Sequence, residues 1–163
     1  MPEKIYVGDL ESLVENKKVE GKQLKIGNEN FYKISNVDKM RPFFMSIVSN
    51  SNHWMFISST GSLSAGRKNS EFSLFPYYTD DKITESSDTT GSKTIILVKK
   101  NNKNFLWEPF SNRYKGAYKV SRNIYKNTIG NKVIFEEVNH DLNVEFSYQW
   151  NSSNIYGFVR KSS

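Results

Sequence analysis

Short apolar runs separated by turn-forming residues occupy most of the chain. Two consecutive runs, residues 42–49 and 53–59, are apolar on both faces, as expected for strands buried between two layers. Asn50, Ser51 and Asn52 between these runs favour a turn. This stretch, the densest in the pattern, therefore predicts a buried strand pair.

The C-terminal half repeats the pattern with a clearer alternation. Val144, Phe146, Tyr148 and Trp150 fall on one face of a predicted strand over 142–150, and polar residues fall on the other. Such alternation is typical of a strand with one face in the core and the other in water. The same pattern predicts further strands over residues 94–99, 105–107, 118–125, 132–138 and 155–159.

The N-terminal part predicts a hairpin and at most one short helix. Residues 22–26 and 30–34 favour strands, and Gly27 and Asn28 between them form a turn pair. A short helix is expected where Asp9 can cap the chain ahead of apolar residues at helical spacing, Leu10, Leu13 and Val14.

Together these elements predict a single all-β domain over residues 1–163, an antiparallel β-sandwich of about ten short strands. The last predicted strand ends close to the C-terminus, which suggests a domain truncated there. The side chains expected to be mainly buried are Phe44, Ile47, Trp54, Phe56, Ile96, Val98, Val144, Phe146 and Tyr148.

Composition agrees with a sheet protein and narrows the possible chemistry. Aromatic residues make up 14% of the chain, and aromatic side chains favour pleated, half-buried surfaces. The absence of cysteine excludes disulfides, thiolate catalysis and zinc–thiolate sites. No apolar stretch is long enough for a signal peptide or a membrane span, so we expect a cytoplasmic protein without a membrane partner.

The net charge of +6 is unevenly distributed. Residues 99–126 carry eight basic side chains and one acidic one, whereas residues 71–88 carry five acidic side chains and one basic one. The basic stretch is either a set of solvated lysines or a patch that attracts an anionic partner. Nucleic acid stays open as a partner because aromatic rings alternate with these cations along the chain. The aromatic residues are Trp107, Tyr114, Tyr118 and Tyr125.

The sequence offers no recognisable catalytic constellation. His53 and His140 are the two histidines, and neither has another at metal-ligand spacing, so we expect both to be structural. Glu136 and Glu137 are neighbours on a predicted strand and should point to opposite faces, which prevents them from acting as a pair. We therefore predict no catalytic residue, no metal ligand and no cofactor.

A polar and aromatic loop after the buried strand pair is the candidate binding site. Sugars stack their apolar C–H faces on exposed rings and bind polar tips with their hydroxyl groups. The candidate carbohydrate-binding residues are Arg67, Asn69, Tyr77, Tyr78, Asp80, Asp81 and Trp107. The alternative is a surface loop whose rings tuck into the edge of the sandwich.

Residues 41–83 read RPFFMSIVSNSNHWMFISSTGSLSAGRKNSEFSLFPYYTDDKI. This order of buried strand pair, glycine-containing turn, Arg67 and aromatic–acidic segment resembles the N-terminal β-supersandwich of cellobiose phosphorylase-like carbohydrate-active proteins. The segment Leu106-Trp107-Glu108-Pro109-Phe110 and the long strands over 133–150 extend the resemblance toward the C-terminus. The motifs are chiefly strand and turn patterns, and residues before Arg41 have no counterpart.

The resemblance implies a role without catalysis. In that family the catalytic residues lie in a downstream (α/α)6 barrel, which this chain cannot build, so no catalytic residue carries over. The chain is then an accessory region of a glycoside phosphorylase or hydrolase, which supports the catalytic domain and contacts an oligosaccharide. The alternatives are a nucleic-acid-binding β domain using residues 99–126 and a protein-interaction module.

Overall fold

The computed structural model describes residues 5–6, 8, 17–75, 77 and 81–163. Half of the chain is in strands, almost all of them antiparallel, and 7% is helical, which confirms the all-β sandwich. The expected N-terminal helix falls on residues 9–16 and lies outside the described residues. Within the described part of the chain, no helix has the length and apolar character needed to cross a membrane.

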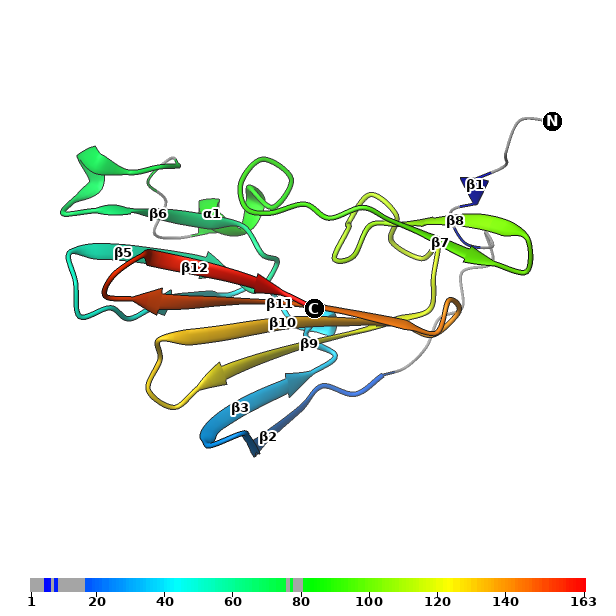
Figure 1. The fold of residues 1–163 in the computed structure, drawn as a ribbon, viewed down its shortest axis with the longest axis horizontal. Helices are drawn as coiled ribbons and strands as arrows, with labels where there is room; N and C mark the ends of the chain where they lie inside the picture. Colours follow the sequence, from blue (N-terminus) through cyan, green and yellow to red (C-terminus); the bar gives the residue numbers. More distant parts are fainter. Residues whose placement is uncertain (1–4, 7, 9–16, 76, 78–80) are drawn as a thin grey trace.

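A six-stranded antiparallel sheet forms one layer of the sandwich (Figure 1). Its strands, in spatial order, are β12 (Gly157–Ser162), β11 (Val144–Ser153), β10 (Lys132–Asn139), β9 (Val120–Asn127), β3 (Glu29–Ser35) and β2 (Glu20–Ile26). Tyr148 of β11 lies opposite Phe135 of β10, which lies opposite Ile124 of β9, so the alternating apolar residues form one continuous inward face.

The second layer consists of two separate three-stranded sheets on the same side of the large sheet (Figure 1). The first contains β4 (Phe44–Ile47), β5 (His53–Ser58) and β6 (Leu63–Arg67). The second contains β1 (Ile5–Tyr6), β8 (Lys103–Trp107) and β7 (Ile96–Lys100), with β1 parallel to β8. The expected single second sheet is thus divided, because the chain between β6 and β7 forms turns and short helices.

One of these helices lies in the predicted binding loop. The helix α1 (Asp81–Glu85) begins at Asp81, one of the candidate carbohydrate-binding residues. Ile83 in α1 is fully buried, and its carbonyl oxygen accepts a hydrogen bond from Ser62 Oγ. The buried hydroxyl groups of Ser58 and Ser62 also bond to each other, which ties α1 to the end of β5.

Side chains from all three sheets meet in one core between the layers. Met55 and Ile57 of β5, Trp107 of β8 and Phe135 of β10 belong to the same buried cluster. Among the side chains expected to be buried, Ile47, Phe146 and Tyr148 are buried. Trp54, Phe56, Ile96, Val98 and Val144 are half-buried.

Phe44 contradicts the expected core. It is 46% exposed, because it lies on the outward face of the edge strand β4. Both faces of the β4–β5 pair are apolar in sequence, yet the six-stranded sheet covers only the inward face. On the outward face Phe44, Trp54 and Phe56 form an aromatic row, with ring centroids 6.3 Å apart for Phe44–Phe56 and 5.7 Å apart for Trp54–Phe56.

Gly66 in β6 makes room for this row. It lies directly opposite Trp54, and a Cβ atom at this position would stand 2.5 Å from the Phe72 carbonyl oxygen and 2.7 Å from the Trp54 ring. It would also stand 2.8 Å from Ser73 Cα. Because two of these atoms belong to the backbone, they have little freedom to move aside.

We therefore expect Gly66→Ala to lower the free energy of unfolding by roughly 1–3 kcal/mol, the usual cost of overpacking. The matched control is Gly21→Ala in β2, where a Cβ atom would meet nothing within 4 Å. Urea unfolding followed by circular dichroism measures both variants. Equal stabilities of the two variants would contradict the close packing at Gly66.

Candidate functional site

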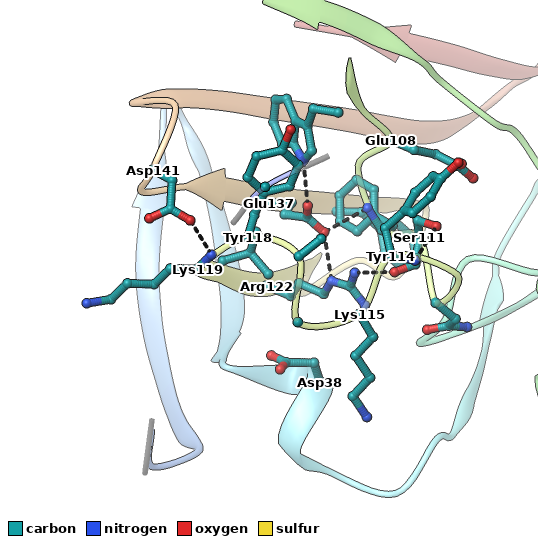
Figure 2. Close-up of a pocket in the computed structure, with 18 of the residues that line it drawn as sticks. Asp38, Glu108, Ser111, Tyr114, Lys115, Tyr118, Lys119, Arg122, Glu137 and Asp141 are labelled. Atoms are coloured by element: carbon teal, nitrogen blue, oxygen red, sulfur yellow. Dashed lines mark hydrogen bonds and ion pairs between the residues drawn. The ribbon is translucent and has the colours of Figure 1, made fainter. Parts of the chain in front are cut away.

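The layers of the sandwich separate at one end and leave a pocket of about 1220 Å³. The pocket lies between β7–β8 on one side and β9–β10 on the other, and the loop over 108–119 borders it. Its floor is apolar and aromatic, and the side chains that form it include Phe105, Trp107, Phe110, Ile124 and Phe135. Figure 2 shows the polar groups that surround this floor.

Glu137 organises the wall of the pocket. It is 1% exposed and lies opposite Arg122 in the β9–β10 register, so the two side chains share the inward face. One carboxylate oxygen accepts from Arg122 Nε at 2.7 Å and from the Phe110 backbone N–H at 2.7 Å. The other accepts from Trp107 Nε1 at 2.9 Å (Figure 2). Three donors thus satisfy a carboxylate that would otherwise be costly to bury.

The same carboxylate holds a strained turn. Phe110 has a φ of 62°, a left-handed conformation that bulky side chains seldom adopt. Its N–H is bound by Glu137, and its ring packs edge-to-face against Tyr148 with centroids 5.3 Å apart. Arg122 continues the link, because its Nη2 donates to the Ser111 carbonyl oxygen at 2.9 Å. Glu137 and Arg122 therefore fix the start of the loop to the sheet.

Tyr118 closes the other end of the loop. Its hydroxyl donates to the Leu106 carbonyl oxygen at 2.7 Å, which attaches the loop to β8. Burial raises the pKa of Tyr118 above its ordinary value, so the hydroxyl keeps its proton and remains a donor. The loop over 108–119 is thus held at one end by the buried Glu137 and at the other by the half-buried Tyr118.

Charged side chains line the rim of the pocket. Asp141 joins two of them, since its carboxylate accepts from the Lys119 backbone N–H at 2.6 Å and its carbonyl oxygen accepts from Lys100 Nζ at 2.6 Å. Lys39 lies 3.5 Å from the Asp38 carboxylate. The other charged residues of the lining are Lys17, Lys103, Glu108, Lys115, Arg122 and Glu137.

The arrangement suits binding better than acid–base catalysis. Both carboxylate oxygens of Glu137 accept hydrogen bonds from donors within the fold. A catalytic acid or base would instead need an oxygen within hydrogen-bond reach of a substrate. Glu136 lies on the opposite face of β10, where it accepts from the hydroxyl of Tyr125 at 2.9 Å. This confirms that the two neighbouring glutamates do not form a pair.

Among the described residues, no group of three or more His, Asp and Glu side chains is placed to hold a metal ion.

The predicted sugar loop is a second, separate feature, beside β5 and β6. Arg67 is exposed at the end of β6, and Asn69 caps the 3-10 helix η2 (Ser70–Phe72) by accepting from the Glu71 N–H at 3.1 Å. Tyr77 is 48% exposed and packs edge-to-face on Trp54 with centroids 5.2 Å apart. Trp54 Nε1 donates to the Asn69 carbonyl oxygen at 3.3 Å. The structure thus gathers Asn69 and Tyr77 around Trp54.

The remaining predicted residues of this site have other positions. Tyr78 and Asp80 lie outside the described residues, and Asp81 begins α1. Trp107 was expected to offer an exposed ring to a sugar, and this is wrong: it ends the strand β8, is 2% exposed and donates to Glu137. A ring in this position belongs to the core and to the pocket floor, and its buried indole offers no face to a sugar in solvent.

The sequence pattern did not identify Trp54 as a candidate binding residue. Its run is apolar on both faces, which predicts a core position, whereas Trp54 and Phe56 on the outward face of β5 are only half-buried. The signal that pointed to it was Gly66, since a glycine opposite a large ring leaves space for that ring above the sheet.

The basic aromatic stretch does not present a row of open rings. Tyr125 is buried and donates to Glu136, Trp107 is buried, and the hydroxyl of Tyr118 is bound to Leu106. Stacking of bases needs exposed ring faces. These three rings therefore give little support to a nucleic-acid site of the stacking type.

Both histidines have partners within the fold. His53 is buried, packs edge-to-face on Phe158 with centroids 4.5 Å apart, and has its Nε2 2.9 Å from Ser49 Oγ. Burial lowers the pKa of His53 below its ordinary value of 6.5, and the nearby Arg67 guanidinium adds to the effect. His140 Nε2 lies 2.8 Å from Ser121 Oγ.

Comparison with known proteins assigns no family. No protein-family model matches the chain, and no curated protein sequence matches it significantly. The functional argument therefore rests on the two features described above, the pocket and the loop beside Trp54.

We expect Glu137→Ala to lower the free energy of unfolding by roughly 3–5 kcal/mol, because it leaves the half-buried Arg122 and two N–H donors without an acceptor. The control is Asp88→Ala, which removes the exposed ion pair with Lys93 at 2.8 Å and should cost less than about 1 kcal/mol. Urea unfolding measures both. A loss below about 1 kcal/mol in both variants would show that Glu137 is not an anchor.

We expect the protein to lose stability between pH 7.5 and pH 5.5 through His53. The folded pKa lies below the unfolded one, so the unfolded chain binds the proton first and stability falls as the pH drops through 6.5. The measurement is urea unfolding at both pH values for wild type and His53→Phe. The variant should show a smaller drop than wild type, and an equal drop would remove His53 as its cause.

Proposed function

We propose that this chain is a non-catalytic β-sandwich domain of a carbohydrate-active protein, which contacts an oligosaccharide and supports a catalytic domain of the (α/α)6 type. The observation that carries the proposal is the Trp54–Tyr77 pair beside the polar loop of Arg67 and Asn69. The sequence resemblance to the cellobiose phosphorylase-like proteins is the reason for proposing a carbohydrate ligand and a catalytic domain as partners.

The Trp54–Tyr77 pair has the elements of a sugar contact. Tyr77 is about half exposed, and its edge-to-face packing on Trp54 holds its ring in place. A fixed, half-exposed ring offers an apolar surface to the C–H face of a pyranose. The exposed side chain of Arg67, at the adjoining end of β6, supplies donors for hydroxyl groups.

The outward face of β4–β6 supports the second part of the proposal. Phe44 on this face is exposed, and so are Phe72 and Leu74 in the segment that follows β6. Leu74 N–H donates to the Ala65 carbonyl oxygen at 2.7 Å, so this segment runs along the edge of the sheet. Grouped exposed apolar side chains mark surfaces that pack against another domain.

The alternatives predict a different response to salt. A nucleic-acid-binding domain would lose affinity steeply as salt rises, because phosphate contacts release counterions. Binding of a neutral glucan by stacking and hydrogen bonds should change little over the same range. A protein-interaction module without sugar binding would show no response to glucans at any salt concentration.

We expect Tyr77→Ala to weaken the binding of gluco-oligosaccharides by roughly 1–3 kcal/mol, the range known for aromatic stacking on nucleic-acid bases. The matched control is Tyr32→Ala, which removes a ring of similar exposure, 51%, on β3. Isothermal titration with a panel of glucans measures both variants and the wild type.

Three outcomes would contradict the proposal. If the wild type binds no glucan at millimolar concentration, the proposed sugar contact is wrong. If Tyr77→Ala and the wild type bind glucans with equal affinity, the proposed position of the site is wrong. Release of glucose or glucose phosphate from the same glucans by the purified chain would overturn its non-catalytic role.

A further inference from the structure

We propose that two copies of this chain associate through the hairpin turns at one end of the sandwich, in a two-fold symmetric contact. Three turns form this surface, which we call the turn end: residues 48–52 between β4 and β5, 128–131 between β9 and β10, and 154–156 between β11 and β12. The turn end shares no residue with the proposed sugar contact, and the inference goes beyond that function and does not rest on it.

The three turns lie side by side at one end of the molecule, on the left in Figure 1. The Val48 N–H donates to the Gly130 carbonyl oxygen at 3.0 Å, which joins the first turn to the second. The Ser152 N–H, just ahead of the third turn, donates to the Asn131 carbonyl oxygen at 3.0 Å. Because backbone hydrogen bonds fix the turns relative to one another, the side chains on them form one surface.

Large apolar side chains on these turns meet solvent. Ile155 is 80% exposed, Tyr156 77% and Ile129 69%, and Val48 beside them is 48% exposed. Turns favour Gly, Pro, Asn, Asp and Ser, so isoleucine on two adjacent hairpin turns is unusual. One exposed apolar side chain needs no explanation, but a group of four on neighbouring turns is typical of a surface that binds another protein.

The turn end also lacks charge. Residues 48–52, 128–131 and 150–157 contain no Asp, Glu, Lys or Arg, although a quarter of the chain, 25%, is charged. Charged residues are depleted and aromatic residues enriched at the centre of protein–protein interfaces. The composition of the turn end therefore matches an interface centre.

Charge favours a second copy of the chain as the partner. The net charge is +6, so two copies repel each other wherever their cationic surfaces meet. At the turn end no charged side chain opposes the approach of an identical surface, and apolar side chains from both copies leave water together.

The shape of the turn end fits the same partner. A pocket of about 170 Å³ opens between the turns, and its lining consists of Val48, Asn50, Ile129, Asn131, Ser152 and Asn154. Ile155 and Tyr156 follow the pocket directly in the chain and are the most exposed apolar side chains of this end. In a two-fold contact the exposed pair of each copy meets the pocket of the other, so one surface supplies both halves of the fit.

Sedimentation velocity of the full chain, from micromolar to millimolar concentration, measures this association. We expect a monomer–dimer equilibrium that Ile155→Asp weakens at least about tenfold, because each copy loses a buried apolar side chain and gains a charge in the contact. The matched control is Leu97→Asp on β7, a side chain of 62% exposure outside the turn end, which changes the net charge equally and should leave the dimer intact. Equal dimer affinities of the two variants would overturn the proposal, and so would a monomeric wild type, which leaves the turn end to a different partner.

Salt distinguishes this contact from one held by ion pairs. Added sodium chloride screens the repulsion between two copies of net charge +6, whereas the turn end has no ion pair to weaken. We therefore expect the wild-type dimer to tighten from low to physiological salt. A dimer that dissociates over the same range would have its contact elsewhere and would contradict the inference.

Amide signals of the ¹⁵N-labelled chain locate the contact. Dilution should shift the backbone signals of Gly130 and Gly157, which adjoin Ile129 and Tyr156, and leave in place the signal of Gly21 on β2. The Trp54 indole N–H reports the outward face of β4–β6, the other surface with exposed aromatic rings. Shifts at Trp54 with none at Gly130 or Gly157 would place the association on that face and refute the turn-end contact.

The outcome is independent of the proposed sugar contact. Glucans that shift the Trp54 signal of a chain that stays monomeric would support the proposed function alone. A dimer that forms through the turn end while glucans leave Trp54 in place would support the further inference alone.

Discussion

The buried carboxylate of Glu137 holds together the part of the fold on which the pocket depends. An acid with almost no exposure is stable in a core only when donors surround it, and Glu137 has three from separate segments. One comes from β8, one from the loop after β8 and one from β9. The carboxylate thereby joins both layers of the sandwich at the place where their apolar side chains begin to separate.

The division of the second layer follows from the chain between β6 and β7. This segment forms turns and α1, whose Ile83 carbonyl oxygen accepts from the buried Ser62 hydroxyl, so the second layer consists of two small sheets. The sheet with β5 packs closely on the large sheet through Met55 and Ile57. The sheet with β8 is attached through Trp107 and Glu137, and beyond them the layers enclose a cavity with charged walls.

The two candidate sites use aromatic residues in opposite ways. Around Trp54 the rings lie on the outside of a sheet whose other face is covered, so they meet solvent and offer a surface to a partner. Around Trp107 the rings form the inner floor of a pocket, and the polar edge of the indole is bound within the core. Aromatic side chains are therefore partly open to solvent at the first site and enclosed by the fold at the second.

The sequence by itself determined the fold class and the inward face of the long strands. Alternation in β11 requires that Phe146 and Tyr148 share a side, and this depends only on the two-residue period of a strand. The same period placed Glu136 and Glu137 on opposite faces. Only the tertiary structure decided which face of an apolar strand is covered, and so which of Trp54 and Trp107 meets solvent. That choice depends on the layers that pack on each sheet, through contacts between residues far apart in the chain, which local periodicity does not record.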